Sequence, residues 1–146
     1  MIGKTFGFTN GIITILALIT GLHATKVNKI GIIGAILALL ITDPLSDAFS
    51  LYTSHKLIDK KKAFNVGLNA FLSQVFLQLL FLIIIIISPN VETALYICYI
   101  IGFILTILYD FYNNIKCKET IKKIFIIFTL VLLTYFIDIF VYKYFN

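Results

Sequence analysis

Long apolar runs, separated by short polar stretches, dominate the chain. The runs that carry few or no charges cover residues 5–22, 64–88, 92–110 and 122–144. A membrane-spanning helix needs about 20 mostly apolar residues, because each adds about 1.5 Å across a hydrocarbon core of about 30 Å. Each run therefore predicts a spanning helix. Pro89 and Asn90 predict a tight turn between the two middle runs, since proline does not continue a helix.

The remaining apolar segment, residues 30–52, is less regular. Its uncharged part ends at Thr42 and is too short to cross a bilayer alone, so a crossing requires the helix to continue through Asp43, Pro44 and Asp47. The alternative is a re-entrant segment that turns back at Asp43-Pro44. We favour the crossing. It predicts an all-α integral membrane protein, a single domain over residues 1–146 with five transmembrane helices and with its termini on opposite sides of the membrane.

Composition narrows the class of protein further. Hydrophobic residues make up 60% of the chain and charged residues 13%, against about 45–50% and about 25% in soluble domains. This excludes a disordered chain, a nucleic-acid-binding domain and an ordinary soluble enzyme, and two cysteines are too few for a disulfide scaffold. No catalytic triad, phosphate-binding loop or zinc-protease motif is present in the sequence. We expect no enzyme, no bound cofactor and no nucleic-acid partner.

The lysines predict the orientation. The net charge of +5 comes from twelve lysines with no arginine. A five-span layout puts nine of them on the side of the N-terminus and three on the other side. Because cytoplasmic loops carry the excess of positive charge, this predicts a cytoplasmic N-terminus and an outside C-terminus. We expect a multi-pass protein in contact with the lipid bilayer, in the plasma membrane of a prokaryote.

Two carboxylates within the second span are the main candidate for chemistry. Asp43 and Asp47 are four residues apart, which places them on one face of a helix. Each Asp costs about 2.5–3.5 kcal/mol to insert at a helix centre, and two neighbouring carboxylates hold a cation or share a proton. Pro44 frees backbone carbonyls that add oxygen ligands. The alternative is a pair that is hydrated at the cytoplasmic interface or neutralised by hydrogen bonds.

Depth along the spans groups further polar residues with this pair. At about 1.5 Å per residue, Asn10 lies near the depth of Asp47 and Thr14 near that of Asp43. We therefore predict Asn10 as a third, neutral oxygen ligand. The residues predicted to line the pathway are Thr9, Thr14, Ser46, Asn69 and Ser73. Gln74 and Gln78 are better explained by hydrogen bonds between helices. Asp138 is either a pathway residue or a hydrogen-bonded interfacial Asp.

Small residues predict where helices pack closely. Gly3, Gly7 and Gly11 recur every four residues in the first span, and Gly31 and Gly34 begin similar pairs with alanines in the second. Such faces allow close backbone approach, within a chain or between subunits. Asp110 and Glu119 lie among lysines and are interpreted as ordinary loop charge.

The first 56 residues resemble the vacuolar iron transporter family. The similar stretches are Phe6 to Thr14 with Ala17, Leu18 and Gly21, then Asp43 to Ala48 with Tyr52, Ser54 and Lys56. This resemblance implies a five-span protein that exports ferrous and manganous ions from the cytosol, as a dimer with its pathway between the subunits.

The chain also departs from that family's pattern. The family's Asp in span one is Asn10 here, and its Met and Glu in span two are Asp47 and Leu51. The acidic cytoplasmic helices of the family are replaced by a short basic loop, so the chain resembles a divergent small member without them. Loss of the thioether favours harder ions, such as Mn²⁺, Mg²⁺ or Ca²⁺.

The sequence therefore predicts a homodimeric transporter of divalent metal cations (Mn²⁺ or Fe²⁺ in kind) out of the cytosol, with Asp43, Asp47 and Asn10 as ligands. Two alternatives stay open. One is a proton-coupled carrier or channel for another small solute. The other is a membrane subunit that does not transport.

Overall fold

The computed structural model describes residues 2–145, with the side chains of residues 2–144. These residues form five helices and no strand: α1 (Ile2–Ala24), α2 (Lys29–Lys56), α3 (Lys60–Ile87), α4 (Val91–Tyr112) and α5 (Cys117–Phe145). Each helix is long and apolar enough to cross a membrane. The prediction of an all-α chain with five such helices is confirmed for these residues. Most of the helices begin or end a few residues beyond the predicted spans.

The second helix is continuous, so the re-entrant alternative is wrong. α2 begins after Asn28, whose side chain accepts a hydrogen bond from the Gly31 backbone N–H at 2.8 Å, and it continues through Pro44. Pro44 is buried. It has no N–H to donate to the Leu40 carbonyl, an interruption that spanning helices tolerate when neighbouring helices cover it.

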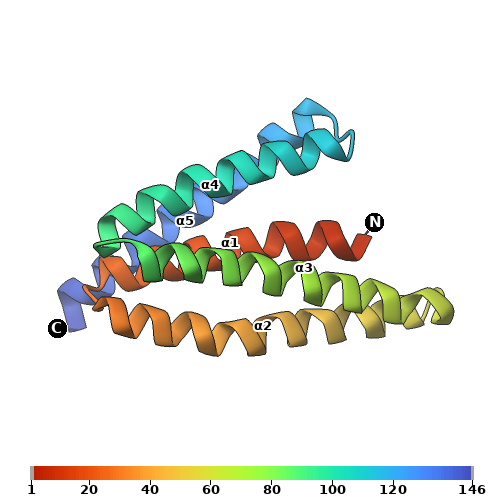
Figure 1. Ribbon diagram of the computed structural model, residues 1–146, viewed down its shortest axis with the longest axis horizontal. Helices are drawn as coiled ribbons and strands as arrows, with labels where there is room; N and C mark the ends of the chain where they lie inside the picture. The colour runs from red at the N-terminus through yellow and green to blue at the C-terminus, as the bar shows by residue number, and fades with distance from the viewer. Residues whose placement is uncertain (1, 146) are drawn as a thin grey trace.

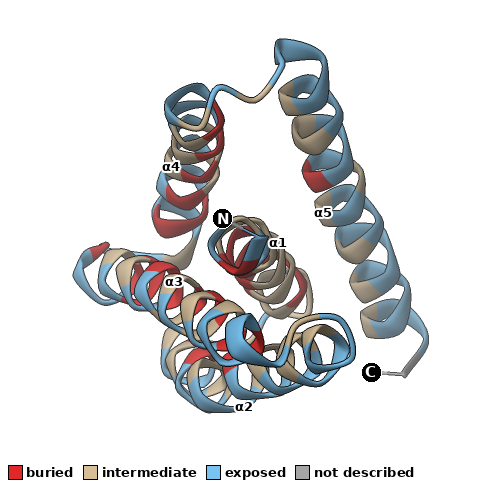
Figure 2. Ribbon diagram, turned by 90° about the vertical axis from the view of Figure 1, so that its right-hand side faces the viewer, coloured by how far each residue is buried: buried red, intermediate tan, exposed pale blue. Residues whose placement is uncertain are grey.

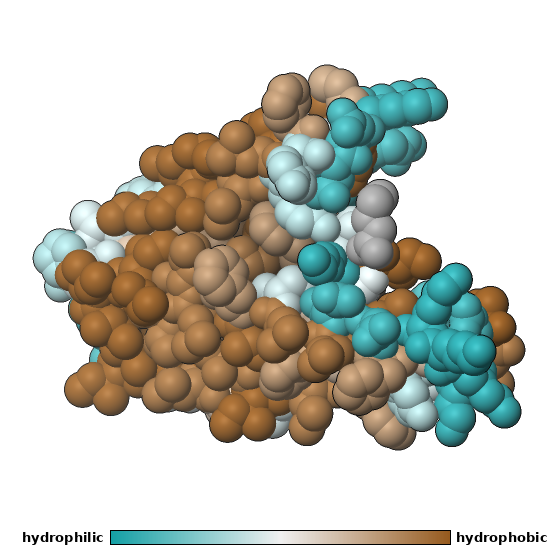
Figure 3. Space-filling model, turned by 45° about the vertical axis from the view of Figure 1, so that its right-hand side comes forward, coloured by the Kyte–Doolittle hydropathy of each residue, from teal (hydrophilic) through white to brown (hydrophobic). Residues whose placement is uncertain are grey.

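The helices run alternately up and down, with α1 in the middle of the other four (Figures 1 and 2). α1 contacts all of them, α2 packs mainly on α3, and α5 packs mainly on α1. The connections α2–α3 and α4–α5 lie at the end of the molecule that holds the N-terminus (Figure 1). The hydrophilic surface is concentrated at these two connections, whereas the sides of the helices are hydrophobic (Figure 3).

The core forms around α1 and α3. Its fully buried side chains include Ile12, Ile15 and Leu16 from α1, Ile32 and Ile36 from α2, Phe81 from α3, Cys98 from α4 and Ile127 from α5. The other described side chains of α5 are half-buried or exposed (Figure 2). Many large apolar side chains face outward on every helix, which suits helices whose outer faces contact lipid.

Glycines set how closely the helices approach one another. A Cβ added at Gly3 would overlap the carbonyl oxygen of Val66, and one at Gly7 would overlap that of Ala70. α1 and α3 therefore touch backbone to backbone, as the glycine spacing predicts. Gly67, which the sequence analysis did not single out, does the same for α3 and α2, since its Cβ would lie 2.7 Å from the Ala48 carbonyl oxygen.

The glycines of α2 do not pack helices together within the chain. A Cβ at Gly34 would meet no atom within 4 Å, and one at Gly31 would meet only Val27 and Asn28 of the preceding turn. Both residues are exposed. The spacing allowed these glycines to pack either within one chain or between subunits. The prediction of packing within one chain is therefore wrong for Gly31 and Gly34.

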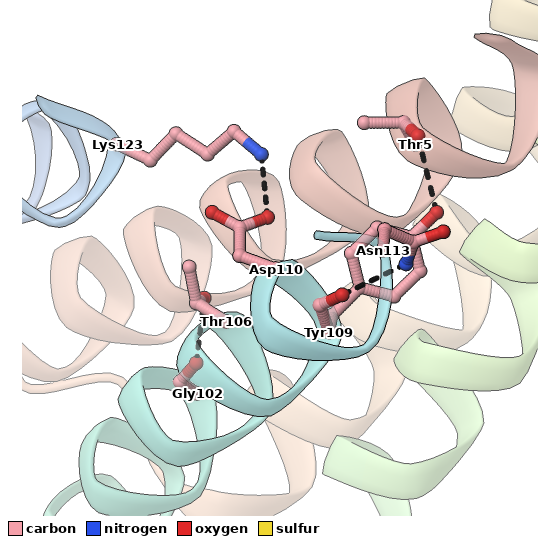
Figure 4. Close-up of polar contacts among 7 residues, drawn as sticks. All are labelled: Thr5, Gly102, Thr106, Tyr109, Asp110, Asn113 and Lys123. Carbon is pink, nitrogen blue, oxygen red and sulfur yellow. Dashed lines mark hydrogen bonds and ion pairs between the residues drawn. The ribbon is translucent and has the colours of Figure 1, made fainter. Parts of the chain in front are cut away.

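Asp110 is not a loop residue, and its interpretation as ordinary loop charge is wrong. It lies in α4, is 1% exposed, and its Oδ1 forms an ion pair of 2.7 Å with the Lys123 ammonium of α5 (Figure 4). The neighbouring Tyr109 hydroxyl lies 3.1 Å from the Thr5 hydroxyl of α1, and its ring stacks on Phe8 at 4.0 Å. These contacts join the N-terminal end of α1 to the α4–α5 hairpin.

The two glycine environments predict opposite effects of adding one methyl group. Gly7→Ala forces α1 away from α3 and should cost about 1–3 kcal/mol of stability, as overpacked cores do. Within one subunit, a Cβ at Gly34 meets no neighbouring helix, so in the detergent-solubilised monomer Gly34→Ala should be neutral or stabilising by up to about 1 kcal/mol through helix propensity. Thermal unfolding in detergent measures both. Equal unfolding temperatures for the two variants would contradict the close α1–α3 packing.

Candidate functional site

The carboxylates of Asp43 and Asp47 lie on the face of α2 that meets α1 and α3. The Asp47 Oδ2 accepts a hydrogen bond of 2.5 Å from the Asn10 side-chain nitrogen of α1. The predicted match in depth between these two residues is therefore observed as a direct contact. Both carboxylates are half-buried, and no lysine is bonded to either of them among the described ion pairs.

Two glutamines of α3 hold the other carboxylate. The Asp43 Oδ2 accepts hydrogen bonds from the Gln74 side-chain nitrogen at 2.5 Å and from that of Gln78 at 3.2 Å. Both glutamines are fully buried. The expected hydrogen bonds between helices at these glutamines are confirmed. Their partner, Asp43, was not foreseen.

Gln74 also contacts α1, through Gly11. Gly11 lies directly against this side chain, since a Cβ at Gly11 would be 3.4 Å from the Cα and Cγ of Gln74. Gly11 thus packs at ordinary contact distance against Gln74 and Leu77 of α3. The third glycine of α1 therefore contributes to the site as well as to helix packing.

Two acceptors beside the carboxylates have no donor. The side-chain oxygens of Gln74 and Gln78 are buried without a hydrogen-bond partner. Leaving a buried polar atom unpaired costs about 1–3 kcal/mol. A half-turn of either amide group exchanges its nitrogen with its oxygen, so each glutamine can present a donor or an acceptor toward Asp43. The site therefore has the means to receive a cation or a proton without new residues.

Of the five predicted pathway-lining residues, three lie on α1 and α2 and two lie on α3. Thr9 and Thr14 of α1 are half-buried, whereas Ser46 is exposed. On α3, Asn69 donates to the Asn65 carbonyl of its own helix at 2.6 Å. Ser73 donates to the carbonyl of Asn69 at 2.6 Å and packs against Gly7. The structure therefore does not bring Asn69 and Ser73 into hydrogen-bonding contact with the carboxylate pair.

A third carboxylate, which belongs to α5, contacts α1 farther from its N-terminal end. Asp138 of α5 sits directly on Gly21, where a Cβ would overlap its Oδ2. It borders a groove of about 380 Å³ between α1, α2 and α5 that is also lined by Thr14 and Leu39. Those two residues are one helical turn from Asn10 and Asp43 respectively. The groove therefore leads from Asp138 toward the carboxylate pair.

The described residues contain no group of three or more His, Cys, Asp or Glu side chains that could hold a metal ion. A cation at the α2 pair would be held by two carboxylates and by amide oxygens. Oxygen donors of this kind suit hard or borderline divalent ions. Comparison with known proteins returns no matching family model, no matching curated protein and no matching solved structure.

The contact between α1 and α2 predicts energetic coupling between its two side chains. In a double-mutant cycle, Asn10→Ala and Asp47→Ala should show a coupling free energy of at least about 0.6 kcal/mol, the average for hydrogen bonds between membrane helices. Unfolding in detergent by SDS titration measures it. Asn69→Ala serves as the matched control, because Asn69 bonds within its own helix. Coupling with Asp47 as large for Asn69 as for Asn10 would contradict the geometry.

Proposed function

We propose that this chain is a membrane transporter of divalent metal cations, of the Mn²⁺ or Fe²⁺ kind, and that Asp43 and Asp47 bind the ion. The observation that carries the proposal is a pair of carboxylates in the interior of a spanning helix. Among the described residues, their side-chain hydrogen bonds come from neutral amide groups only. The resemblance of the first 56 residues to vacuolar iron transporters points to the same class of substrate.

The energetics support a functional role for the pair. Inserting two Asp side chains near a helix centre costs about 5–7 kcal/mol on the translocon scale. Three hydrogen bonds between membrane helices return about 2 kcal/mol at their average value. The hydrogen bonds therefore return less free energy than inserting the two carboxylates costs, so joining helices does not explain the pair. Intramembrane carboxylates usually mark ion or proton pathways.

In the proposed mechanism the ion replaces the amide donors. It binds between the carboxylates, and the amide groups of Gln74, Gln78 and Asn10 turn their oxygens toward it. This turn gives a ligand role to the two glutamine oxygens that have no partner. When the ion leaves, the amide nitrogens donate hydrogen bonds to the carboxylates again, so each carboxylate always has either the ion or a hydrogen-bond donor as its partner.

The proposed direction is from the end that holds the N-terminus toward Asp138. Lysine-rich connections at that end make it the cytoplasmic side by the positive-inside rule. Along α1, Asn10 and Gly21 are eleven residues apart, or about 16 Å. An ion released from the pair therefore has one acidic side chain, Asp138, ahead of it in the groove.

We include a homodimer in the proposal. The exposed face of α2 around Gly34 has room for the backbone of a second copy, because no atom lies within 4 Å of a Cβ placed there. Small residues on such a face allow close contact between spanning helices.

A proton carrier is the second candidate, and the amide groups favour it specifically. A protonated Asp43 can donate a hydrogen bond to a glutamine oxygen, whereas an ionised Asp43 accepts a hydrogen bond from a glutamine nitrogen. Both protonation states are therefore satisfied by the same residues. Protons are also a plausible counter-ion for the metal, so the two candidates differ in whether metal moves at all.

Metal flux into proteoliposomes tests the proposal. Wild-type protein should transport Mn²⁺ or Fe²⁺, and the variant Asp43→Asn/Asp47→Asn should lose this flux at matched reconstitution. Glu119→Gln is the control, because this carboxylate is exposed and pairs with Lys122 on α5, so its flux should be unchanged. Folded wild type that moves neither ion, across a pH gradient of either direction, would exclude transport of these two metals.

The groove predicts a weaker role for the third carboxylate. Asp138→Asn should lower metal flux while leaving Mn²⁺ binding at the α2 pair intact, since Asp138 lies beside Gly21, about 10 Å along α1 from the depth of Asp43 and about 16 Å from that of Asp47. Binding isotherms and initial rates separate the two effects. A loss of binding equal to that in the Asp43→Asn/Asp47→Asn variant would contradict a separate exit position for Asp138.

A further inference from the structure

A second pair of cavities lies between α1, α4 and α5, apart from the α2 carboxylates. One is an apolar chamber of about 290 Å³. The other is a more polar crevice of about 370 Å³. Both are lined by Thr20, Tyr99 and Tyr135, so they adjoin one another at these side chains. Thr20 is ten residues beyond Asn10 on α1, or about 15 Å away.

Aromatic side chains form much of the wall of the chamber, which is open along α5, where Phe128 is 55% and Tyr135 41% exposed. Phe103 of α4 and Phe128 of α5 join Tyr99 and Tyr135 in its lining. The only polar groups there belong to the two tyrosines and Thr20, and the hydroxyls of Tyr99 and Thr20 lie 2.5 Å apart. Thr20 also donates to the carbonyl of Leu16 in its own helix. Four of the seven lining residues are thus aromatic, and no charged side chain is among them.

The crevice adds one acidic group. Glu92, in the first turn of α4, lines it together with His23 and Tyr96. No lysine is among the residues that line either cavity. The exposed Glu92 carboxylate attracts positive charge, and aromatic side chains are the usual recognition surface for quaternary ammonium groups.

We propose that this crevice and chamber form a binding site for an organic ammonium cation with an apolar body. The cation would enter past Glu92 and rest against the rings of Tyr99 and Tyr135, with its apolar part toward Phe103 and Phe128. An anion is disfavoured by Glu92, and a bare metal ion finds only one carboxylate there. A lipid acyl chain would use the apolar chamber but gain nothing from the acidic entrance.

Binding of benzyltrimethylammonium to the detergent-solubilised full chain tests the proposal. Calorimetry should detect saturable binding to the wild type. Tyr135→Leu should weaken it by about three- to thirtyfold, the range expected for cation–π contacts. Glu92→Gln removes an exposed carboxylate and should weaken it by about two- to fivefold. Phe125→Leu is the matched control, because Phe125 also lies on α5, is 68% exposed and is not among the residues that line either cavity. Its affinity should equal that of the wild type.

Two comparisons make the test decisive. Neopentylbenzene has the same shape without the charge, and binding of this compound that is as tight and as sensitive to Tyr135→Leu would show an apolar lipid-type chamber and overturn the proposal. So would absent binding, or binding that neither variant weakens. If Tyr135→Leu does not fold, Phe128→Leu replaces it, with the same exposed Phe125→Leu as control. The Asp43→Asn/Asp47→Asn variant should bind the cation normally, which separates this site from the proposed metal pathway.

Discussion

The hydrogen bonds that α1 and α3 donate to the carboxylates of α2 constrain the rest of the structure. A carboxylate inside a bilayer must have a partner, and here the partners are Asn10 on one neighbouring helix and Gln74 and Gln78 on the other. These contacts exist only if the three helices lie close together. Gly7 and Gly67 permit that approach by letting backbones touch, and Gly11 packs against Gln74.

The same constraint shapes the proposed chemistry. Amide groups can face a carboxylate with either a donor or an acceptor, and no described ion pair ties Asp43 or Asp47 to a basic residue. By contrast, Asp110 at the end of α4 is paired with the Lys123 ammonium at 2.7 Å. We interpret that ion pair as a structural fastening between α4 and α5. The different partners thus lead us to assign a structural role to Asp110 and to propose an ion-binding role for Asp43 and Asp47.

The sequence predicts the helices well because the bilayer imposes a length that apolar runs reveal directly. It also predicts that Asn10 lies near the depth of Asp47, since depth along antiparallel helices follows from residue counting, and the structure shows the two side chains in contact. Counting gives depth but not the face of a helix. Ser73 and Gln74 are adjacent in depth, yet Ser73 packs on Gly7 whereas Gln74 bonds Asp43. The burial of Asp110 was missed for a related reason, because its partner lies on a different helix.

The central claim is that a divalent cation binds at Asp43 and Asp47 by displacing amide donors. Infrared difference spectroscopy of the protein in bilayers, recorded on addition of Mn²⁺, tests it most directly. The account predicts shifts in the carboxylate stretching bands and in the side-chain amide bands of glutamine and asparagine. Both shifts should be absent from the Asp43→Asn/Asp47→Asn variant. A spectrum that Mn²⁺ leaves unchanged, or changes equally in that variant, would contradict the claim.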